Sequence, residues 1–152
     1  MNYKLKSTLT VFPILFIVAV SSSCKSTQTW TSKKEMKEIY IPNFKLTYFK
    51  RLLIAGYNNT NEIKSIVFDD RSGYSESILS IEDYDLIDSL VKIDNHTMVL
   101  DSINRIAKVA EGSEGKHVFG YALNKYQSNW LDKLSKERFK IFWRKEKQSQ
   151  IK

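Results

Sequence analysis

The order of hydrophobic and polar residues predicts several short β-strands. The clearest signal is a β-hairpin at about residues 62–79. Its two runs, 63–68 and 74–79, are rich in β-branched and aromatic residues and flank a polar turn that ends at Gly73. Three further strands are predicted at residues 38–41, where Pro42 would close the strand, at 117–123, and at 138–144, where apolar and basic residues alternate.

Other segments space their apolar residues three and four positions apart, which predicts helices. Ser80 and Asp83 resemble a capping box at the start of one such helix, and residues 94–97 would break it. Gly56 and Gly112 are natural helix stops. Helices are therefore predicted over residues 44–53, 81–92 and 102–111, with a short one capped by Asn129. Mixed strands and helices of this kind predict a small single domain of the α+β class with a C-terminal strand.

The first residues carry the pattern of an exported protein. Lys4 and Lys6 precede an almost wholly apolar run at residues 9–20, and small serines then lead to Cys24. A positive start, a short apolar run and small residues at a cleavage site are typical of a secretory signal peptide. The run is too short to span a membrane, which takes about 20 residues. A buried N-terminal helix is the alternative, but it does not explain why the chain's single cysteine follows the run.

This segment resembles the signal peptides of bacterial lipoproteins. Ser22, Ser23 and Cys24 match the end of the lipobox, while Ser21 stands where the family usually has an aliphatic residue. A less strict lipobox that ends in Ser-Cys and is followed by Lys, as at residues 23–25, resembles the lipoboxes of the Bacteroidota. The resemblance implies cleavage before Cys24, acylation of its thiol and a stable hold on the bilayer by two or more acyl chains. Lys25 is not the Asp that retains enterobacterial lipoproteins in the inner membrane, which implies the outer membrane. The residues after Cys24 also lack the acidic side chains of surface-exported Bacteroidota lipoproteins, which implies a protein that faces the periplasm.

The resemblance of the first 24 residues and the pattern of the remaining chain together predict four parts. These are a signal peptide over residues 1–23, a lipidated cysteine with a polar tether over 24–37, the α+β domain over 38–147 and a disordered tail over 148–152. Removal of two lysines with the signal peptide lowers the net charge from +7 to +5. Once Cys24 is acylated, the chain has no thiol for a disulfide or a metal.

No motif in the sequence predicts catalysis, a cofactor or a metal site. The segment from Gly112 to His117 lacks the first glycine and the Ser or Thr of a phosphate-binding loop. Ser113 lacks one of the two glycines of a nucleophile elbow, because Glu111 occupies that place. The two histidines, His96 and His117, have no metal-binding spacing. A pair of acids brought together only by folding, as in some hydrolases, stays open.

Basic and aromatic residues alternate near the C-terminus, from Arg138 through Lys140 and Arg144 to Lys147. Single-stranded nucleic acids bind to surfaces of this kind, but export makes nucleic acid an unsuitable partner. The pattern also suits an edge strand whose charges prevent pairing with other strands. A third interpretation is a basic face that lies on anionic lipid or on an acidic protein.

The leading functional hypothesis is a lipid-tethered, non-enzymatic domain that recognises a protein partner, by analogy with small inhibitors and immunity proteins. Two loops are the expected contact sites, because loops on a rigid scaffold often carry binding. Their residues are Asp70, Arg71 and Tyr74 in the first loop, and Glu111, Glu114 and His117 in the second. The alternatives are a structural or assembly component of the envelope and a hydrolase with an unrecognised acid pair.

Two serines also match a modification pattern. Ser89 and Ser102 each stand between an aspartate and an aliphatic residue, which resembles the O-glycosylation sites of Bacteroidota proteins. The sequence therefore predicts two possible glycosylated positions.

Overall fold

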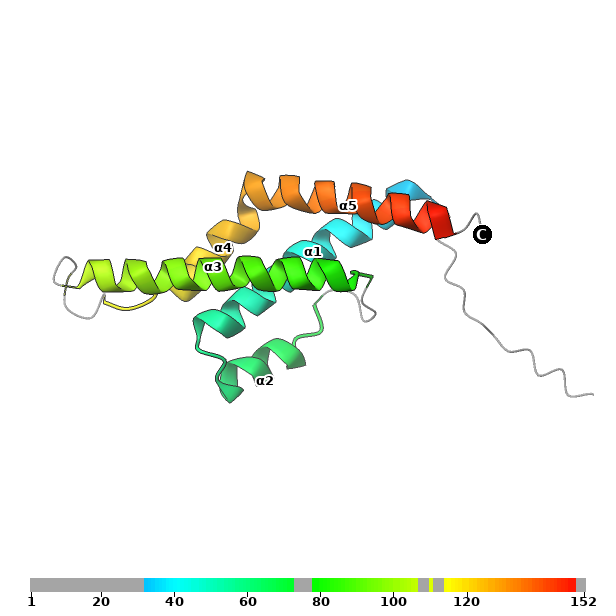
Figure 1. Ribbon diagram of the computed structural model, residues 1–152. Helices are drawn as coiled ribbons and strands as arrows, with labels where there is room; N and C mark the ends of the chain where they lie inside the picture. Colours follow the sequence, from blue (N-terminus) through cyan, green and yellow to red (C-terminus); the bar gives the residue numbers. More distant parts are fainter. Residues whose placement is uncertain (1–31, 73–77, 107–109, 111–113, 150–152) are drawn as a thin grey trace, which may run out of the picture.

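A computed structural model describes residues 32–72, 78–106, 110 and 114–149, and over these ranges the fold is entirely helical (Figure 1). The predicted α+β class is therefore wrong, because no strand occurs in the described part of the chain. The elements are α1 (Lys33–Gly56), α2 (Asn61–Asp69), α3 (Ile81–Arg105), α4 (Val118–Gln127) and α5 (Asn129–Ser149). None of these helices is long and apolar enough to cross a bilayer.

Helix α1 forms the centre of the fold and contacts each of the other four helices. Its N-cap is Ser32, whose hydroxyl accepts a hydrogen bond from the Glu35 amide at 3.2 Å. One side of the helix carries a large apolar residue at every fourth position, and these side chains are buried. They are Met36, Tyr40, Phe44, Tyr48 and Leu52. Residues spaced by four share one face of a helix, so this row supplies the surface on which α3, α4 and α5 pack.

Three of the predicted strands lie in helices because their apolar residues also fit helical spacing, whereas most of the second hairpin arm, 74–79, lies outside the described residues. In the first arm of the expected hairpin, Val67 is the buried residue of α2, and Ile66 is exposed. Val118 and Ala122, four positions apart, are the buried residues of α4. The expected final strand belongs to α5, where Phe139 is buried and three aromatic residues join the core at helical spacing, namely Phe139, Phe142 and Trp143. A short apolar run fits the residue spacing of a strand as well as that of a helix. Burial of these residues against the rest of the fold stabilises the helical form.

The N-terminal strand prediction fails for a related reason. Residues 38–41 lie in α1, which starts at Lys33 within the segment expected to be tether, and Pro42 stands inside the helix. A proline in a helix interior removes a backbone donor and costs about 3 kcal/mol. Tyr40 and Phe44 on either side of it are both completely buried. Their burial offsets the cost of the proline.

Helix α3 runs unbroken through the predicted helix break at residues 94–97. The capping box at its start is confirmed, since Ser80 and Asp83 exchange hydrogen bonds as the motif requires. Asp94, expected in the break, is instead a buried residue of the helix. The predicted helices over 81–92 and the start of 102–111 thus belong to one element.

Gly56 ends α1 as predicted and allows a close approach to α4. A Cβ atom at this position would lie 2.4 Å from a methyl group of buried Val118. The next residues, Asn58 and Asn59, both have φ of 58°, the left-handed conformation that asparagine tolerates. The chain can therefore turn sharply into α2.

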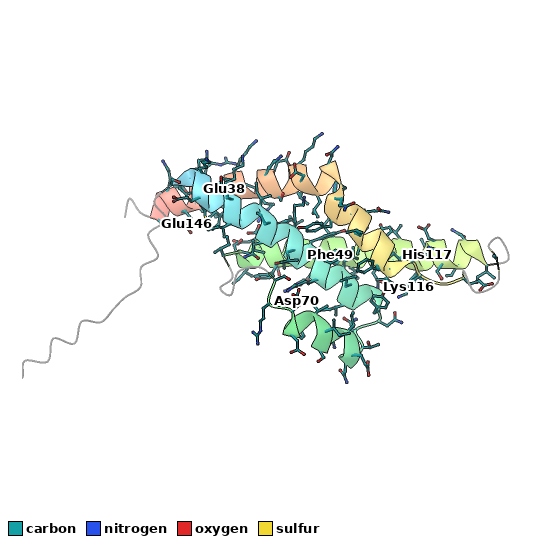
Figure 2. The ribbon with its side chains drawn as sticks, turned by 180° about the vertical axis from the view of Figure 1, so that it is seen from behind. Glu38, Phe49, Asp70, Lys116, His117 and Glu146 are labelled. Carbon is teal, nitrogen blue, oxygen red and sulfur yellow. The ribbon has the colours of Figure 1, made fainter. Side chains whose placement is uncertain are left out.

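Helices α1 and α5 run antiparallel, which brings the N-terminal end of α1 beside the C-terminal end of α5. The Tyr40 ring lies 5.0 Å from that of Phe142, and the Tyr48 ring lies 6.3 Å from that of Trp130. Figure 2 shows Glu38 and Glu146 together at this end and His117 near the opposite one. We call the end that carries Glu38 and Glu146 the α1–α5 end. The C-terminal half of α3 points away from this end (Figure 1).

Candidate functional site

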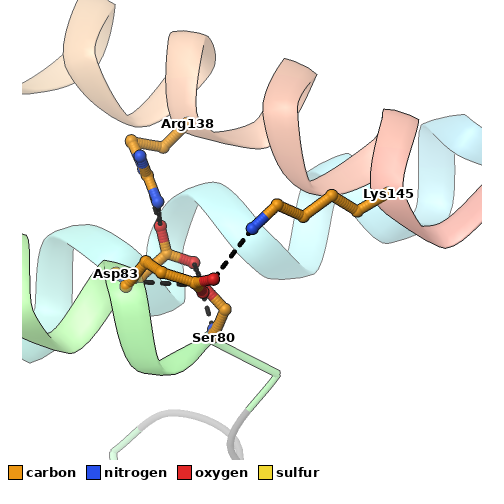
Figure 3. Close-up of polar contacts among 5 residues, drawn as sticks. Ser80, Asp83, Arg138 and Lys145 are labelled. Atoms are coloured by element: carbon orange, nitrogen blue, oxygen red, sulfur yellow. Dashed lines mark hydrogen bonds and ion pairs between the residues drawn. The ribbon is translucent and has the colours of Figure 1, made fainter.

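The first buried polar cluster centres on Asp83, which is 1% exposed. The Arg138 guanidinium of α5 donates from Nε and Nη2 to Asp83 Oδ1, both at 2.7 Å. The amide and hydroxyl of Ser80 donate to Asp83 Oδ2 at 3.1 and 3.0 Å. Figure 3 shows the carboxylate between these groups. Both oxygens are thus fully engaged, so Asp83 joins α3 to α5 and has no capacity left for acid–base chemistry.

Tyr40 of α1 lies beside this ion pair. Burial, followed by the nearby Asp83 carboxylate, raises the pKa of the Tyr40 hydroxyl far above its ordinary value. The hydroxyl therefore stays protonated at physiological pH, which makes it unsuitable as a base or as a nucleophile.

A pocket of about 370 Å³ opens beside the cluster, between the start of α3 and the C-terminal half of α5. Lys145 and Glu82 form an ion pair of 2.9 Å on its wall. Lys145, through a hydrogen bond, is the main cause that lowers the pKa of Glu82 to about 2. The volume lies near the lower limit of ligand pockets, about 300 Å³. Glu82 pairs with Lys145 and Asp83 with Arg138, so among the acids that line the pocket only Glu146 forms no ion pair in the described structure.

The second buried cluster centres on Asp94, which is 5% exposed and lies three turns further along α3. Tyr121 donates a hydrogen bond to its Oδ1 at 2.7 Å, and Lys125 forms an ion pair with the same atom at 2.7 Å. Tyr48 of α1 donates to Oδ2. Burial raises the pKa values of Tyr48 and Tyr121, and the Asp94 carboxylate adds to both increases. This cluster joins α3 to α1 and α4.

Neither cluster has the composition of a metal site. Over the described ranges, no three His, Cys, Asp or Glu side chains are grouped so that they could hold an ion. Asp83 and Asp94 are the buried acids there, and both oxygens of each accept hydrogen bonds from side chains or amides of the protein itself. The hydrolase alternative therefore gains no acid pair from the buried residues of the described structure.

The structure places the first predicted binding loop at the end of α2. Asp70 follows this helix and is exposed; it accepts hydrogen bonds from the amide and hydroxyl of Ser72 and pairs with Lys50 at 3.1 Å. These contacts, led by Ser72, lower the pKa of Asp70 to about 2. Arg71 is exposed, and Tyr74 lies outside the described residues.

The second predicted loop lies elsewhere. Glu114 and His117 are exposed just before α4, and Glu111 lies outside the described residues. Figure 2 shows His117 well apart from Asp70, so the two loops do not form one site. His117 lines a hollow of about 30 Å³ together with Asp101 and Ser102. That volume holds about one water molecule, so this Asp, Ser and His set has no room for a substrate.

The predicted glycosylation sites both lie on α3. Ser89 belongs to its exposed face, and its hydroxyl donates to the Asp85 carbonyl at 2.9 Å. Ser102 is half-buried beside the hollow near His117. Of the two, Ser89 has the more accessible hydroxyl.

An apolar surface stripe on α3 is the main feature that the sequence did not predict. Ile93, Leu100 and Ile103 are 62%, 46% and 56% exposed, and their spacing of seven and three residues places them on one side of the helix. We call these residues the α3 stripe. It lies on the half of α3 that points away from the α1–α5 end (Figure 1). The expected helix break at 94–97 had divided the segment that carries it.

Comparisons with known proteins give no relative for this chain. No protein family, curated protein or solved structure matches it.

Proposed function

We propose that this chain is an envelope lipoprotein whose helical domain binds a protein partner without catalysing a reaction. The observation that carries the proposal is the α3 stripe. Its aliphatic side chains expose 46% or more of their surface. Isolated apolar residues are common on protein surfaces, whereas a row of them on one helix is typical of a contact surface for another protein.

The buried polar groups support the non-enzymatic part of the proposal. Both oxygens of the Asp83 and Asp94 carboxylates accept hydrogen bonds from groups of the protein itself. A catalytic acid or base needs a free position for the reacting proton. Both clusters instead suit a rigid scaffold that presents one helix to a partner.

The anchoring part rests on the resemblance of residues 1–24 to lipoprotein signal peptides. Attachment to the outer membrane, facing the periplasm, is part of the proposal. Replacement of the thiol by Cys24→Ser would give an uncleaved or soluble product. Unchanged processing and unchanged membrane retention of this variant would refute lipid attachment at Cys24.

Photo-crosslinking tests the binding surface directly. A photoreactive phenylalanine analogue at position 100 of the full chain, irradiated in the native cells, should give one adduct of defined mass. The same analogue at position 66 is the matched control, because Ile66 is an aliphatic residue on α2 that is 67% exposed, more than the 46% of Leu100. The adduct should disappear when Ile93→Asp and Ile103→Asp are added and persist with Ile66→Asp. No adduct at position 100, or the same adducts at both positions, would contradict the proposal.

A further inference from the structure

Five cations share the outer face of α5. Lys133, Lys136, Lys140, Arg144 and Lys147 recur at three- and four-residue spacing and are all exposed. We call this set the basic face. The opposite side of the helix carries Leu131, Ser135 and Phe139, which are buried. The cations therefore have one common direction, away from the core.

In the part of the chain that the structure describes, most of this charge has no acidic partner. Within the described ranges, Lys136 is the one member of the basic face that forms an ion pair, with Asp132. Lys147 lies 5.8 Å from the ring of Trp143, a half-buried residue near the end of the same helix. Glu137 stands among the cations and reduces their charge only in part.

Lysines of α1 extend the basic face. Lys136 first, and then Lys45 and Lys37 of α1, lower the pKa of Asp132, so α1 cations lie next to α5. Lys34 and Lys37 also line an open hollow of about 430 Å³, together with Glu38, Ile41 and Pro42. A mostly apolar hollow rimmed by lysines suits the boundary between lipid headgroups and acyl chains.

The position of Cys24 brings this surface close to the bilayer. Helix α1 begins at Lys33, nine residues after the cysteine. Nine residues span at most about 30 Å when fully extended. A lipid anchor at Cys24 therefore holds the α1–α5 end within that distance of the membrane.

Three observations support a second membrane contact: the charge of the basic face, the apolar hollow lined by Lys34 and Lys37 (the α1 hollow), and the short distance from Cys24 to α1. We infer that the basic face and the α1 hollow bind anionic lipid headgroups. The inference rests on the proposed lipid anchor, which supplies the proximity. Juxtamembrane cations are attracted to anionic leaflets over roughly a Debye length, about 8–10 Å.

The test uses the full chain, isolated from membranes and reconstituted into vesicles. Gln148→Cys introduces a single labelling site at the end of α5, because Cys24 is the chain's only cysteine and the anchor occupies it. An environment-sensitive dye at position 148 should shift to the blue in vesicles with about one third phosphatidylglycerol, but not in pure phosphatidylcholine. About 0.5 M NaCl should reverse the shift. The same dye on Asn104→Cys, at the far end of α3, should not respond.

Charge reversal provides matched variants. Lys140→Glu with Arg144→Glu should abolish the shift, since each lost cation weakens attraction to an anionic surface about fivefold. Lys64→Glu with Lys92→Glu changes the net charge equally, on α2 and α3, and should leave the shift intact. Circular dichroism of both variants checks that the helices persist.

The outcomes separate the inference from the anchor. A lipidated chain with the same dye emission in both vesicle types overturns the inference alone. Loss of the position-100 adduct with Lys140→Glu and Arg144→Glu, without any lipid-dependent shift, also overturns it and assigns the face to a protein. A chain without lipid that binds only the anionic vesicles, in a salt-sensitive manner, refutes the anchor and supports the face. Binding to neither vesicle type refutes both.

Discussion

The two buried carboxylates of α3 hold the same helix in different ways. Asp83 is bound by a two-fold contact from Arg138 and by its own capping serine. Asp94 is bound by two tyrosine hydroxyls and by Lys125, whose side chain is 31% exposed. The rigid guanidinium fork has few alternative positions, whereas a flexible lysine can move its charge into water. We therefore expect the α3 start to depend more strongly on its carboxylate than the α3 centre does.

The largest effect should come from Asp83→Ala. The substitution leaves the mostly buried Arg138 without its partner and removes part of the helix cap. Loss of one partner of a buried ion pair costs about 3–5 kcal/mol of unfolding free energy. Urea denaturation measures this loss. The double variant Asp83→Ala with Arg138→Met should recover part of it; a double variant as unstable as the sum of both single changes would argue against the ion pair.

Asp94→Asn should have a smaller effect. The amide keeps one acceptor for a tyrosine but loses the charge that binds Lys125. Hydrogen bonds to charged groups contribute about 1.5–3 kcal/mol, and Lys125 can turn to solvent, so we expect a loss of about 2 kcal/mol in the same urea assay. A loss larger than that of Asp83→Ala would reverse the comparison.

Gly56→Ala tests the packing of α1 against α4, next to the Asp94 cluster. The added methyl group would meet Val118 at 2.4 Å and Met98 at 3.3 Å. Overpacking of a filled core costs about 1–3 kcal/mol. Gly120→Ala is the matched control within α4, since a Cβ atom there meets nothing within 4 Å. It should raise the unfolding free energy by about 0.4–1 kcal/mol, and equal effects of the two substitutions would exclude the close approach.

The tyrosines of the two clusters should make the fold sensitive to alkali. Burial raises the pKa of Tyr48 above its ordinary value near 10. Above pH 10 the unfolded chain therefore loses the proton while the folded chain keeps it, so stability is complete below about pH 10 and falls as the pH rises further. Thermal melts between about pH 8 and pH 11 should show a shallower decline for Tyr48→Phe than for the unchanged chain. Identical slopes would contradict this assignment.

The sequence predicted local signals better than the fold. The capping box at Ser80 and the helix stop at Gly56 are confirmed, because each depends on a few adjacent residues. The strands at 63–68, 117–123 and 138–144 are wrong because short β-branched and aromatic runs fit either period until their packing partner is known. The cap of α5 was one residue off, since the Ser128 hydroxyl, not Asn129, accepts the Leu131 amide.

The polar clusters were beyond prediction for a different reason. Asp83 and Arg138 are 55 positions apart, and no local pattern indicates that they meet. Asp94 looked like a helix breaker, yet donors from α1 and α4 stabilise it inside α3. The α3 stripe could have been found from the spacing of Ile93, Leu100 and Ile103 if the helix had been read through residues 94–97.

The mass of the intact protein, extracted from the membranes of its native cells, tests the central claim of lipid attachment most directly. We predict a chain that lacks residues 1–23 and carries the added mass of two or more acyl chains at Cys24. Tandem mass spectrometry would place the lipid on the N-terminal residue. A chain that keeps its first 23 residues, or a mature chain with an unmodified thiol, would contradict the account.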